Sequence, residues 1–304
     1  MQLKVVILGA GVMGLGLARH FLKADFAVAL CDPGVAARET ASQALPNARV
    51  LGAIADLGPA WVQPDLVIEA VPEKLALKHQ VLTEAEAFFA PDVIIASNTS
   101  GIPTRDLSAP MRHPERLAIA HFFNPPDVIP VVEVIGSSAM PEADLQKLAG
   151  VLRQSGKEPA ILRREMPGFV ANRIQHAMMR ECLHLLDEGV ADVETLDAVI
   201  RWSIGVRLAF TGPFLQRDLN GLDTHAAIAG YLYRDLSAAT GPSHSLSDRV
   251  AAGALGRKSG KGFYDWTPAR EAAARKAEAR MARMIEEMQT AHGVAGPDRD
   301  SRAE

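Results

Sequence analysis

A glycine-rich turn close to the start of the chain restricts the possible folds more than any other feature. The apolar run Val5–Leu8 leads directly into Gly9–Gly14, which has the spacing G-x-G-x-x-G, and a helical apolar pattern follows. Because glycine has no side chain, such a turn bends tightly, lets the backbone approach a pyrophosphate and lets the helix pack on the strand. The turn therefore predicts a βαβ dinucleotide-binding unit with phosphates beside Gly9, Gly11, Val12, Met13 and Gly14.

An acidic residue after the next predicted strand indicates which dinucleotide binds. The apolar run Ala27–Cys31 ends at Asp32, 18 residues after Gly14. A carboxylate in this position accepts hydrogen bonds from both hydroxyls of an adenine ribose and repels a 2′-phosphate. The next basic residue, Arg38, follows only six positions later. These observations predict NAD rather than NADP as the cofactor, and they disfavour a plain surface turn with an unrelated aspartate.

Short apolar runs alternate with helical stretches through the first 165 residues. Apolar strands separated by helices are typical of a parallel sheet that is covered on both faces. The pattern predicts a Rossmann-type, doubly wound α/β sheet as a domain over residues 1–165. The strand candidates are Lys4–Leu8, Ala27–Cys31, Leu66–Ala70, Val93–Ala96, Leu117–Ala120 and Val131–Ile135.

The pattern changes near residue 166, where strand signals stop and helical spacing replaces them. Pro167 suits the first turn of a helix, and the apolar spacing continues to Gly189. We therefore expect an all-helical domain over residues 166–292 and a frayed tail over residues 293–304. Further helices are predicted over Val193–Ser203, Pro213–Leu236 and Pro268–Ala291.

Composition excludes several classes of partner. The formal net charge is -4 and no strongly basic block occurs, which argues against nucleic acid or an anionic membrane surface. The apolar runs are too short to span a bilayer, and the N-terminus lacks a signal-peptide pattern. Two cysteines, Cys31 and Cys182, cannot form a disulfide framework. We expect a soluble cytoplasmic protein without a metal site.

Four residues form a candidate acid–base set. His121 ends a predicted strand, and an imidazole can accept a hydroxyl proton while hydride leaves. Glu133 can hold the other ring nitrogen, while Ser100 and Asn172 can donate hydrogen bonds to a substrate oxygen. Taken singly, each has an ordinary interpretation as well: a core histidine, a strand-end charge or a polar surface residue.

Together, these residues lie within motifs that resemble a known family, the L-3-hydroxyacyl-CoA dehydrogenases. The motifs occur in that family's order from the N-terminus to about residue 266. They are Gly9–Gly14, Val67–Glu73, Ser97–Ser100, His121–Pro125 with Glu133, Pro167–Arg173, Gly212–Phe214, Asp218–Asp223 and Lys258–Asp265.

The resemblance implies a role for each matching position. His121 becomes the general base and Glu133 its partner, while Ser100 and Asn172 orient the reacting oxygen of the substrate. The helical domain becomes a dimer interface, so the resemblance implies a homodimer. Contacts to the nicotinamide half of the cofactor are implied for Glu73, Lys78, Ser100, Asn124 and Lys258.

Two departures from the family pattern concern the substrate. Acyl-CoA members carry a longer, lysine-bearing segment after the ribose-binding acid, whereas no lysine lies between Asp32 and Pro64. Gly101, Ile129-Pro130 and Ile204–Phe210 resemble a branch that acts on free small acids. That branch includes carnitine dehydrogenase, gulonate 3-dehydrogenase (lambda-crystallin) and a hydroxymethylpyridine carboxylate dehydrogenase. Arg207 then reads either as a clamp for a substrate carboxylate or as a surface charge at a helix end.

The preferred hypothesis is an NAD-dependent oxidoreductase acting on a 3-hydroxy acid or a 3-hydroxyacyl substrate, with a small free acid slightly preferred. One alternative is a short-chain 3-hydroxybutyryl-CoA dehydrogenase. Another is the two-domain β-hydroxyacid dehydrogenase class that uses a helix-borne lysine, which the His121 to Glu133 spacing disfavours. A third is a non-catalytic NAD-binding structural protein.

Overall fold

The computed structural model describes residues 2–291, and these residues divide into two compact units. The first unit contains residues 2–170 and 278–291, and the second contains residues 171–277. The tail predicted over residues 293–304 lies outside the described residues. None of the helices within residues 2–291 is both long and apolar enough to cross a membrane.

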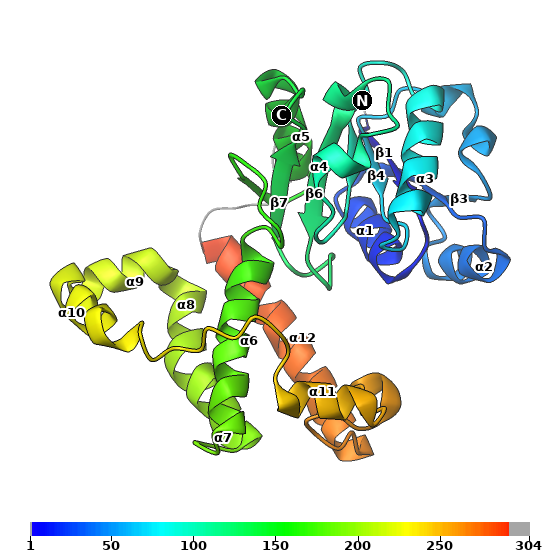
Figure 1. Cartoon of the computed structure of the whole chain (residues 1–304). Coiled ribbons are helices and arrows are strands. Elements are labelled where there is room, and N and C mark those ends of the chain that lie inside the picture. The colour runs from blue at the N-terminus through cyan, green and yellow to red at the C-terminus, as the bar shows by residue number, and fades with distance from the viewer. Residues whose placement is uncertain (1, 292–304) are drawn as a thin grey trace. The chain divides into compact units, whose positions relative to one another are not determined.

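The first unit is built on one eight-stranded sheet with the strand order β3-β2-β1-β4-β5-β6-β7-β8 (Figure 1). The order reverses direction at β1 and β4, as a doubly wound fold requires, and it confirms the predicted fold class. The strands are β1 (Lys4–Leu8), β2 (Ala27–Cys31), β3 (Arg49–Leu51), β4 (Leu66–Glu69), β5 (Ile95–Ser97), β6 (Leu117–Phe122), β7 (Val131–Gly136) and β8 (Glu158–Ile161).

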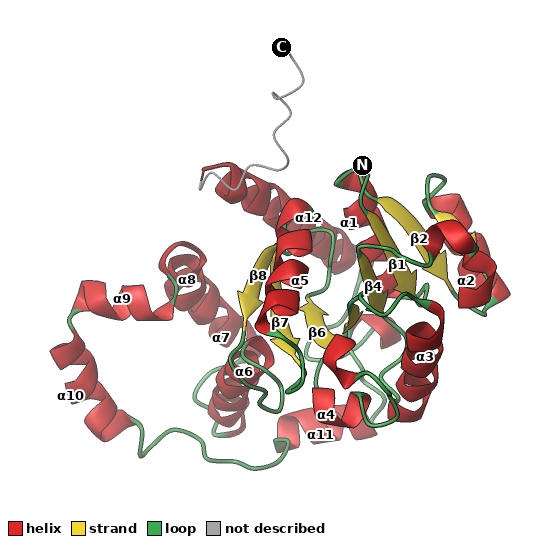
Figure 2. Ribbon diagram, turned by 90° about the horizontal axis from the view of Figure 1, so that it is seen from above, coloured by secondary structure: helices red, strands yellow, loops and turns green. Residues whose placement is uncertain are grey.

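Helices cover both faces of this sheet (Figure 2). One apolar cluster joins the sheet to α1 and α5, and a second joins it to α3 and α4. Because both faces are covered, the central strands are apolar throughout, and all six residues of β6 are buried. The helices are α1 (Val12–Lys23), α2 (Val35–Ala44), α3 (Leu75–Phe88), α4 (Thr104–Leu107) and α5 (Glu142–Gln154), with short 3-10 turns at Ile54–Leu57, Pro59–Trp61 and Pro114–Arg116.

One pair of neighbouring strands departs from the parallel arrangement that the sequence pattern indicated. Strand β7 runs antiparallel to β6, whereas the other neighbouring pairs are parallel. Only residues 123–130 connect β6 to β7, and a parallel crossover needs roughly a dozen or more residues. The short edge strands β3 and β8 were not predicted, since β3 has three residues and β8 contains Pro159.

The second unit is helical, with corrections to the predicted bounds. The helix expected from Pro167 begins at Ala171, because Gly168 and Phe169 have φ angles of 75° and 50° that a right-handed helix excludes. The single helix expected over residues 213–236 is divided in two at Gly221, which has φ 89°. The second of the two helices ends at Leu232. The run from Val193 continues to Thr211 through a π-helical segment.

The helix expected over Pro268–Ala291 is confirmed, whereas α11 was not predicted. The second unit thus contains α6 (Ala171–Asp187), α7 (Val193–Val199), the π-helical segment Ile200–Gly205, α8 (Val206–Thr211), α9 (Pro213–Asn220), α10 (Leu222–Leu232), α11 (His244–Ala251), the 3-10 turn Arg257–Ser259 and the beginning of α12 (Pro268–Ala291).

Candidate active site

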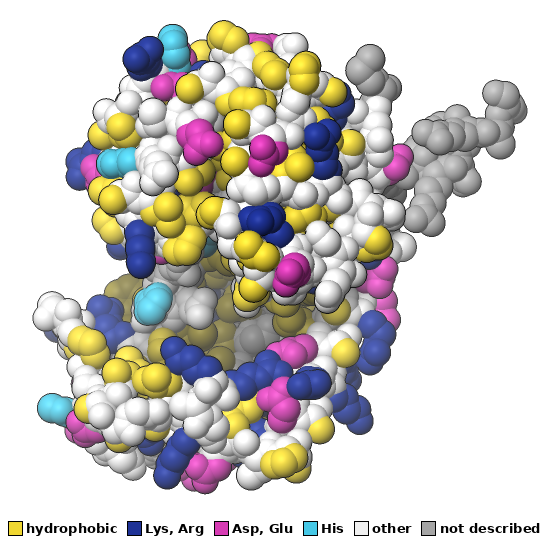
Figure 3. All heavy atoms as spheres, turned by 90° about the vertical axis from the view of Figure 1, so that its right-hand side faces the viewer, with side chains coloured by type: hydrophobic (Ala, Val, Ile, Leu, Met, Phe, Trp, Pro, Cys, Tyr) yellow, Lys and Arg dark blue, Asp and Glu magenta, His cyan; other side chains and the backbone are white. Residues whose placement is uncertain are grey.

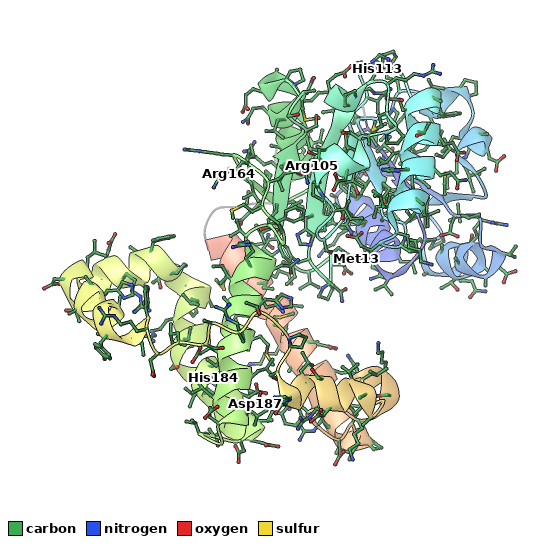
Figure 4. All side chains as sticks on the ribbon, in the orientation of Figure 1. Met13, Arg105, His113, Arg164, His184 and Asp187 are labelled. Atoms are coloured by element: carbon green, nitrogen blue, oxygen red, sulfur yellow. The ribbon has the colours of Figure 1, made fainter. Side chains whose placement is uncertain are left out.

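The glycine turn has the shape that a phosphate-binding loop needs. A Cβ atom added to Gly9, which has φ 110°, would lie 2.8 Å from the Ala70 carbonyl oxygen, and one added to Gly14 would lie 1.9 Å from the Gly9 oxygen. In contrast, nothing lies within 4 Å of a Cβ added to Gly11, and no side chain caps α1. The first turn of α1 therefore offers N–H groups and space for a pyrophosphate. This turn contains the exposed Val12 and also Met13, which is labelled in Figure 4.

Asp32 lies beside this turn, at the end of β2. Its Oδ2 atom accepts a hydrogen bond from the Ala10 N–H at 2.7 Å, and its Oδ1 atom accepts one from the Gly34 N–H at 2.8 Å. A carboxylate has about four acceptor positions, so it can still receive ribose hydroxyls. Arg38 donates to the carbonyl oxygens of Asp32 and Pro33. The loop and the acid together fit an adenine dinucleotide.

A buried ion pair lies at the carboxyl ends of β4 and β5. The Lys78 Nζ atom lies 2.8 Å and 3.0 Å from the two oxygens of Glu69, and both residues are at most 1% exposed. Glu69 also accepts hydrogen bonds from the Val71 N–H and the Ser97 hydroxyl. Lys78, which we expected to contact the nicotinamide, is therefore enclosed by protein, with Glu73 as its more exposed neighbour at 3.2 Å.

Glu73 links this ion pair to Ser100. One oxygen of Glu73 accepts hydrogen bonds from the Thr99 hydroxyl and, at 3.1 Å, from the Ser100 N–H. Burial alone would raise the pKa of Glu73, but the Thr99 hydroxyl and the Lys78 ammonium hold it below its ordinary value. The carboxylate therefore stays ionised, and Glu73 connects Ser100 to the segment just before α3.

His121 and Glu133 are direct partners across the antiparallel strands β6 and β7. Cross-strand neighbours have their side chains on the same face of a sheet, which brings the two groups together. The Nδ1 atom of His121 lies 2.8 Å from Glu133 Oε2, and the residues are 4% and 3% exposed. The other oxygen of Glu133 accepts a hydrogen bond from the Val170 N–H at 2.9 Å.

The imidazole is enclosed by two aromatic rings. The ring centroids of Phe123 and Phe169 lie 4.7 Å and 5.4 Å from that of His121. Phe169 is one of the residues whose left-handed backbone delays the start of α6. Because Nδ1 of His121 pairs with Glu133, Nε2 is the ring nitrogen that remains for another partner.

The first unit thus gathers most of the predicted residues at one edge of its sheet. Gly9–Gly14, Asp32, Glu73, Ser100 and His121 follow or end strands whose carboxyl ends share that edge. Asn124 lies in the loop after β6. Asn172, Arg207 and Lys258 belong to the second unit, so their closeness to the other residues stays a prediction. Arg207 is exposed and donates from Nε to the Ser203 carbonyl oxygen at 2.7 Å.

The comparisons with known proteins show the family to which this chain belongs. One Rossmann sheet carries a glycine turn, an acid after the next strand and a histidine–carboxylate pair. This combination is typical of an NAD-dependent dehydrogenase. The family model for the 3-hydroxyacyl-CoA dehydrogenase NAD binding domain matches residues 4–166, and that for the C-terminal domain matches residues 168–266. The chain belongs to the 3-hydroxyacyl-CoA dehydrogenase family, and NAD is its cofactor.

Its relatives include enzymes of small carboxylic acids. The chain is 34% identical to the 5-formyl-3-hydroxy-2-methylpyridine 4-carboxylate 5-dehydrogenase of Mesorhizobium japonicum, over 87% of this chain and 91% of that protein. It is 33% identical to the L-carnitine dehydrogenase of Streptomyces coelicolor over 98% of each. A solved structure described as 5-formyl-3-hydroxy-2-methylpyridine 4-carboxylic acid 5-dehydrogenase, an NAD⁺-dependent dismutase, has a TM-score of 0.86 and 32% identity, with coverage of 96% and 99%. These findings confirm the family and the branch.

Sequence reasoning did not single out Glu69 as part of the site. The signal that could have identified it is a carboxylate at the end of the apolar run Leu66–Glu69. A buried charge needs a partner, and the lysine nine positions later supplies it. The amide of Val170 as a partner of Glu133 left no comparable signal, because 37 residues separate the two.

Proposed function

We propose that this enzyme oxidises an alcohol carbon β to a carboxyl or acyl group, or reduces the matching ketone, with His121 as general base and Glu133 as its partner. The supporting observation is the 2.8 Å hydrogen bond between these two buried side chains. A histidine oriented by a carboxylate at the cofactor-binding edge of a Rossmann sheet is suited to moving a hydroxyl proton.

The residues divide the work between binding and proton transfer. His121 removes the hydroxyl proton at Nε2, and Glu133 stabilises the imidazolium that forms. Ser100 and Asn172 hold the substrate oxygen, while Glu73, Asn124 and Lys258 hold the nicotinamide half of the cofactor. Lys78 acts behind Glu73 because it is only 1% exposed. When bound, NAD would supply the acceptor for the carbinol hydrogen, which leaves as a hydride in the oxidation direction.

We propose further that the substrate is a small free hydroxy acid rather than a coenzyme A ester. A coenzyme A tail carries several phosphate charges and calls for Lys or Arg side chains nearby. The basic residues between Asp32 and Pro64 are Arg38 and Arg49, and each donates to backbone carbonyl oxygens of its own segment. Two relatives are dehydrogenases of L-carnitine and of a pyridine carboxylate, which supports the same class of substrate.

The test is the ratio of kcat/KM for 3-hydroxybutyryl-CoA to that for the best free acid in a panel that includes L-carnitine. We expect a ratio below one. Arg207→Ala should then raise KM for the free acid by about tenfold or more, the usual loss for a charged hydrogen-bond partner. Arg201→Ala, another exposed arginine of the same helical run, is the control. A ratio well above one, with Arg207→Ala active, restores the 3-hydroxybutyryl-CoA alternative.

The non-catalytic alternative has its own test. A structural NAD-binding protein would bind NAD but form no NADH with any member of the panel, whereas any turnover that disappears in His121→Ala excludes this alternative. The intact pair of His121 and Glu133 favours catalysis.

We also propose a homodimer formed by the helical domain, within a cytoplasmic enzyme. Apolar side chains on α8 and α9 are exposed, among them Phe210 at 61% and Phe214 at 87%. A second copy of the chain is the partner that would cover such faces in a closed, symmetric pair. Cys31 and Cys182 are free thiols, as a reducing compartment allows.

A further inference from the structure

A buried lysine lies outside the residues discussed so far. Lys157 lies between α5 and β8, is 3% exposed, and has no carboxylate within ion-pair distance among residues 2–291. Its Nζ atom donates to the carbonyl oxygens of Pro126 at 2.6 Å and Ile129 at 2.7 Å. Both oxygens belong to the loop of residues 123–130 that joins β6 to β7.

This loop has the position of a support for the proposed active site. It follows His121 by one residue of β6, it contains Asn124, and it leads into β7, which carries Glu133. Within the loop, the N–H groups of Val128 and Ile129 both donate to the Pro125 carbonyl oxygen. The carbonyl oxygens of Pro126 and Ile129 instead accept from Lys157. Lys157 is therefore the group that fastens the middle and the end of the loop.

The other side of the loop contacts the phosphate-binding helix. A Cβ atom added to Gly16 of α1 would lie 2.4 Å from Pro126 Cγ, so the helix and the loop are in close contact. Arg19 of α1 also forms an ion pair with Asp127 at 2.9 Å. The loop therefore has Lys157 on one side and α1, the helix expected to bind the pyrophosphate, on the other.

The charge of Lys157 is unfavourable for stability where it lies. Burial lowers the pKa of Lys157 to about 8, with Asp127 opposing that shift. His20 on α1 lies near Lys157, and burial lowers the pKa of His20 to about 3, so its imidazole is neutral at pH 7. An apolar side chain would fill this position without the cost of desolvating an ammonium group.

We propose that Lys157 is a positioning residue, whose ammonium group holds the loop of residues 123–130 against α1 and so places Asn124 and His121 relative to bound NAD. The assignment rests on the proposed function for the roles of Asn124 and His121. The fastening of the loop is independent of that function.

The experiment compares Lys157→Met with Lys147→Met, an exposed lysine on α5. Hydrogen exchange of the ligand-free proteins reports on the Val128 and Ile129 amides, and NAD titration gives the Kd. We expect exchange of these amides to be about tenfold faster in Lys157→Met, and the Kd for NAD to rise by about tenfold, because two buried carbonyls lose their donor. Lys147→Met should leave both unchanged.

Two results overturn the proposal. One is unchanged loop exchange in folded Lys157→Met, whatever its melting temperature; the other is faster exchange with an unchanged Kd for NAD, which marks a merely structural lysine. Should Lys157→Met fail to fold, Lys157→Arg keeps a charged donor and Lys157→Gln a shorter, neutral one. Near wild-type exchange in Lys157→Arg with faster exchange in Lys157→Gln supports the proposal. Equal exchange rates in these two variants overturn it. If Lys157→Met exchanges faster but the wild-type protein shows no dehydrogenase turnover, only the proposed function is contradicted.

Discussion

The two units of this protein differ in how they bury their apolar side chains. In the first unit, whole strands are inaccessible, and Val6, Ile68 and Leu117 have no exposed surface. In the second unit, residues 171–277, which the structure describes completely, Leu183 is the only apolar side chain in the buried class. Trp202 there is 70% exposed, and apolar side chains are visible at the surface between charged ones (Figure 3). The first unit has its own core, whereas the helices of the second leave most of their apolar side chains partly or fully exposed.

The polar side chains differ in the same way. The first unit encloses charged groups in fixed networks, such as Glu69 with Lys78 and His121 with Glu133. In the second unit, pairs such as Arg257 with Glu271 lie at the surface. Hydrogen bonds away from water fix geometry more strongly than solvated ones do. We therefore expect proton transfer to depend on the first unit and dimer formation to depend on the second.

The largest effect should come from His121→Ala. Loss of a general base lowers kcat by about 10² to 10⁴, while NAD binding and the oligomeric state remain. Glu133→Gln should cost less, because the base remains but loses its orienting charge. The control is His113→Ala, an exposed histidine at the opposite edge of the sheet from Met13 (Figure 4). Steady-state kinetics decide, and full turnover in His121→Ala would remove the proposed mechanism.

The second effect concerns assembly. Phe214→Asp with Leu219→Asp places charges on an apolar face of α9, where the side chains are 87% and 69% exposed. We expect the dimer dissociation constant to rise by on the order of 10²-fold, as for central interface residues. Val35→Asp, at a 60% exposed position of the first unit, should change nothing in sedimentation velocity. Wild-type protein that sediments only as a monomer at micromolar concentration contradicts the dimer proposal.

A smaller effect is expected at the ribose. Asp32→Ala removes the acceptor for the ribose hydroxyls together with the hydrogen bonds to Ala10 and Gly34. The Kd for NAD should rise by about tenfold, and the preference over NADP should relax, because a negative charge no longer repels a 2′-phosphate. Asp144→Asn on α5 serves as the matched control. Equal affinity of the wild-type enzyme for NAD and NADP would defeat the prediction.

The smallest effect is a pH dependence of stability in the first unit. Burial lowers the pKa of His20 from 6.5 to about 3, so the unfolded chain binds a proton below pH 6.5 that the folded chain does not. Stability from this group is complete above pH 6.5 and is lost as the pH falls toward 3. Between pH 7.5 and 5.5, the free energy of unfolding should fall by about 1 kcal/mol more in the wild type than in His20→Gln. Urea titrations at the two pH values measure this difference, and an equal fall in the free energy of unfolding for the two proteins would contradict it.

Much of the first unit could be predicted because its signals are local. The turn of Gly9–Gly14 depends on backbone freedom at single residues, and the strand candidates depend on runs of a few apolar side chains. The helix over Pro268–Ala291 was equally clear from its spacing and its initial proline. The start of α6 was not, because Phe169 has a left-handed backbone conformation that its residue type does not suggest.

By itself, the sequence determined the βαβ unit, the glycine turn with the acid that follows it, and the change from strands to helices near residue 166. Only the tertiary structure decided that β7 runs antiparallel to β6, which sets His121 opposite Glu133. It also decided that Lys78 is enclosed by Glu69 and that Lys157 fastens the loop after β6. The physical reason is the range of the interactions. Backbone sterics and apolar periodicity act between near neighbours, whereas the partner of a buried charge is set by strands and loops that meet only in the folded chain.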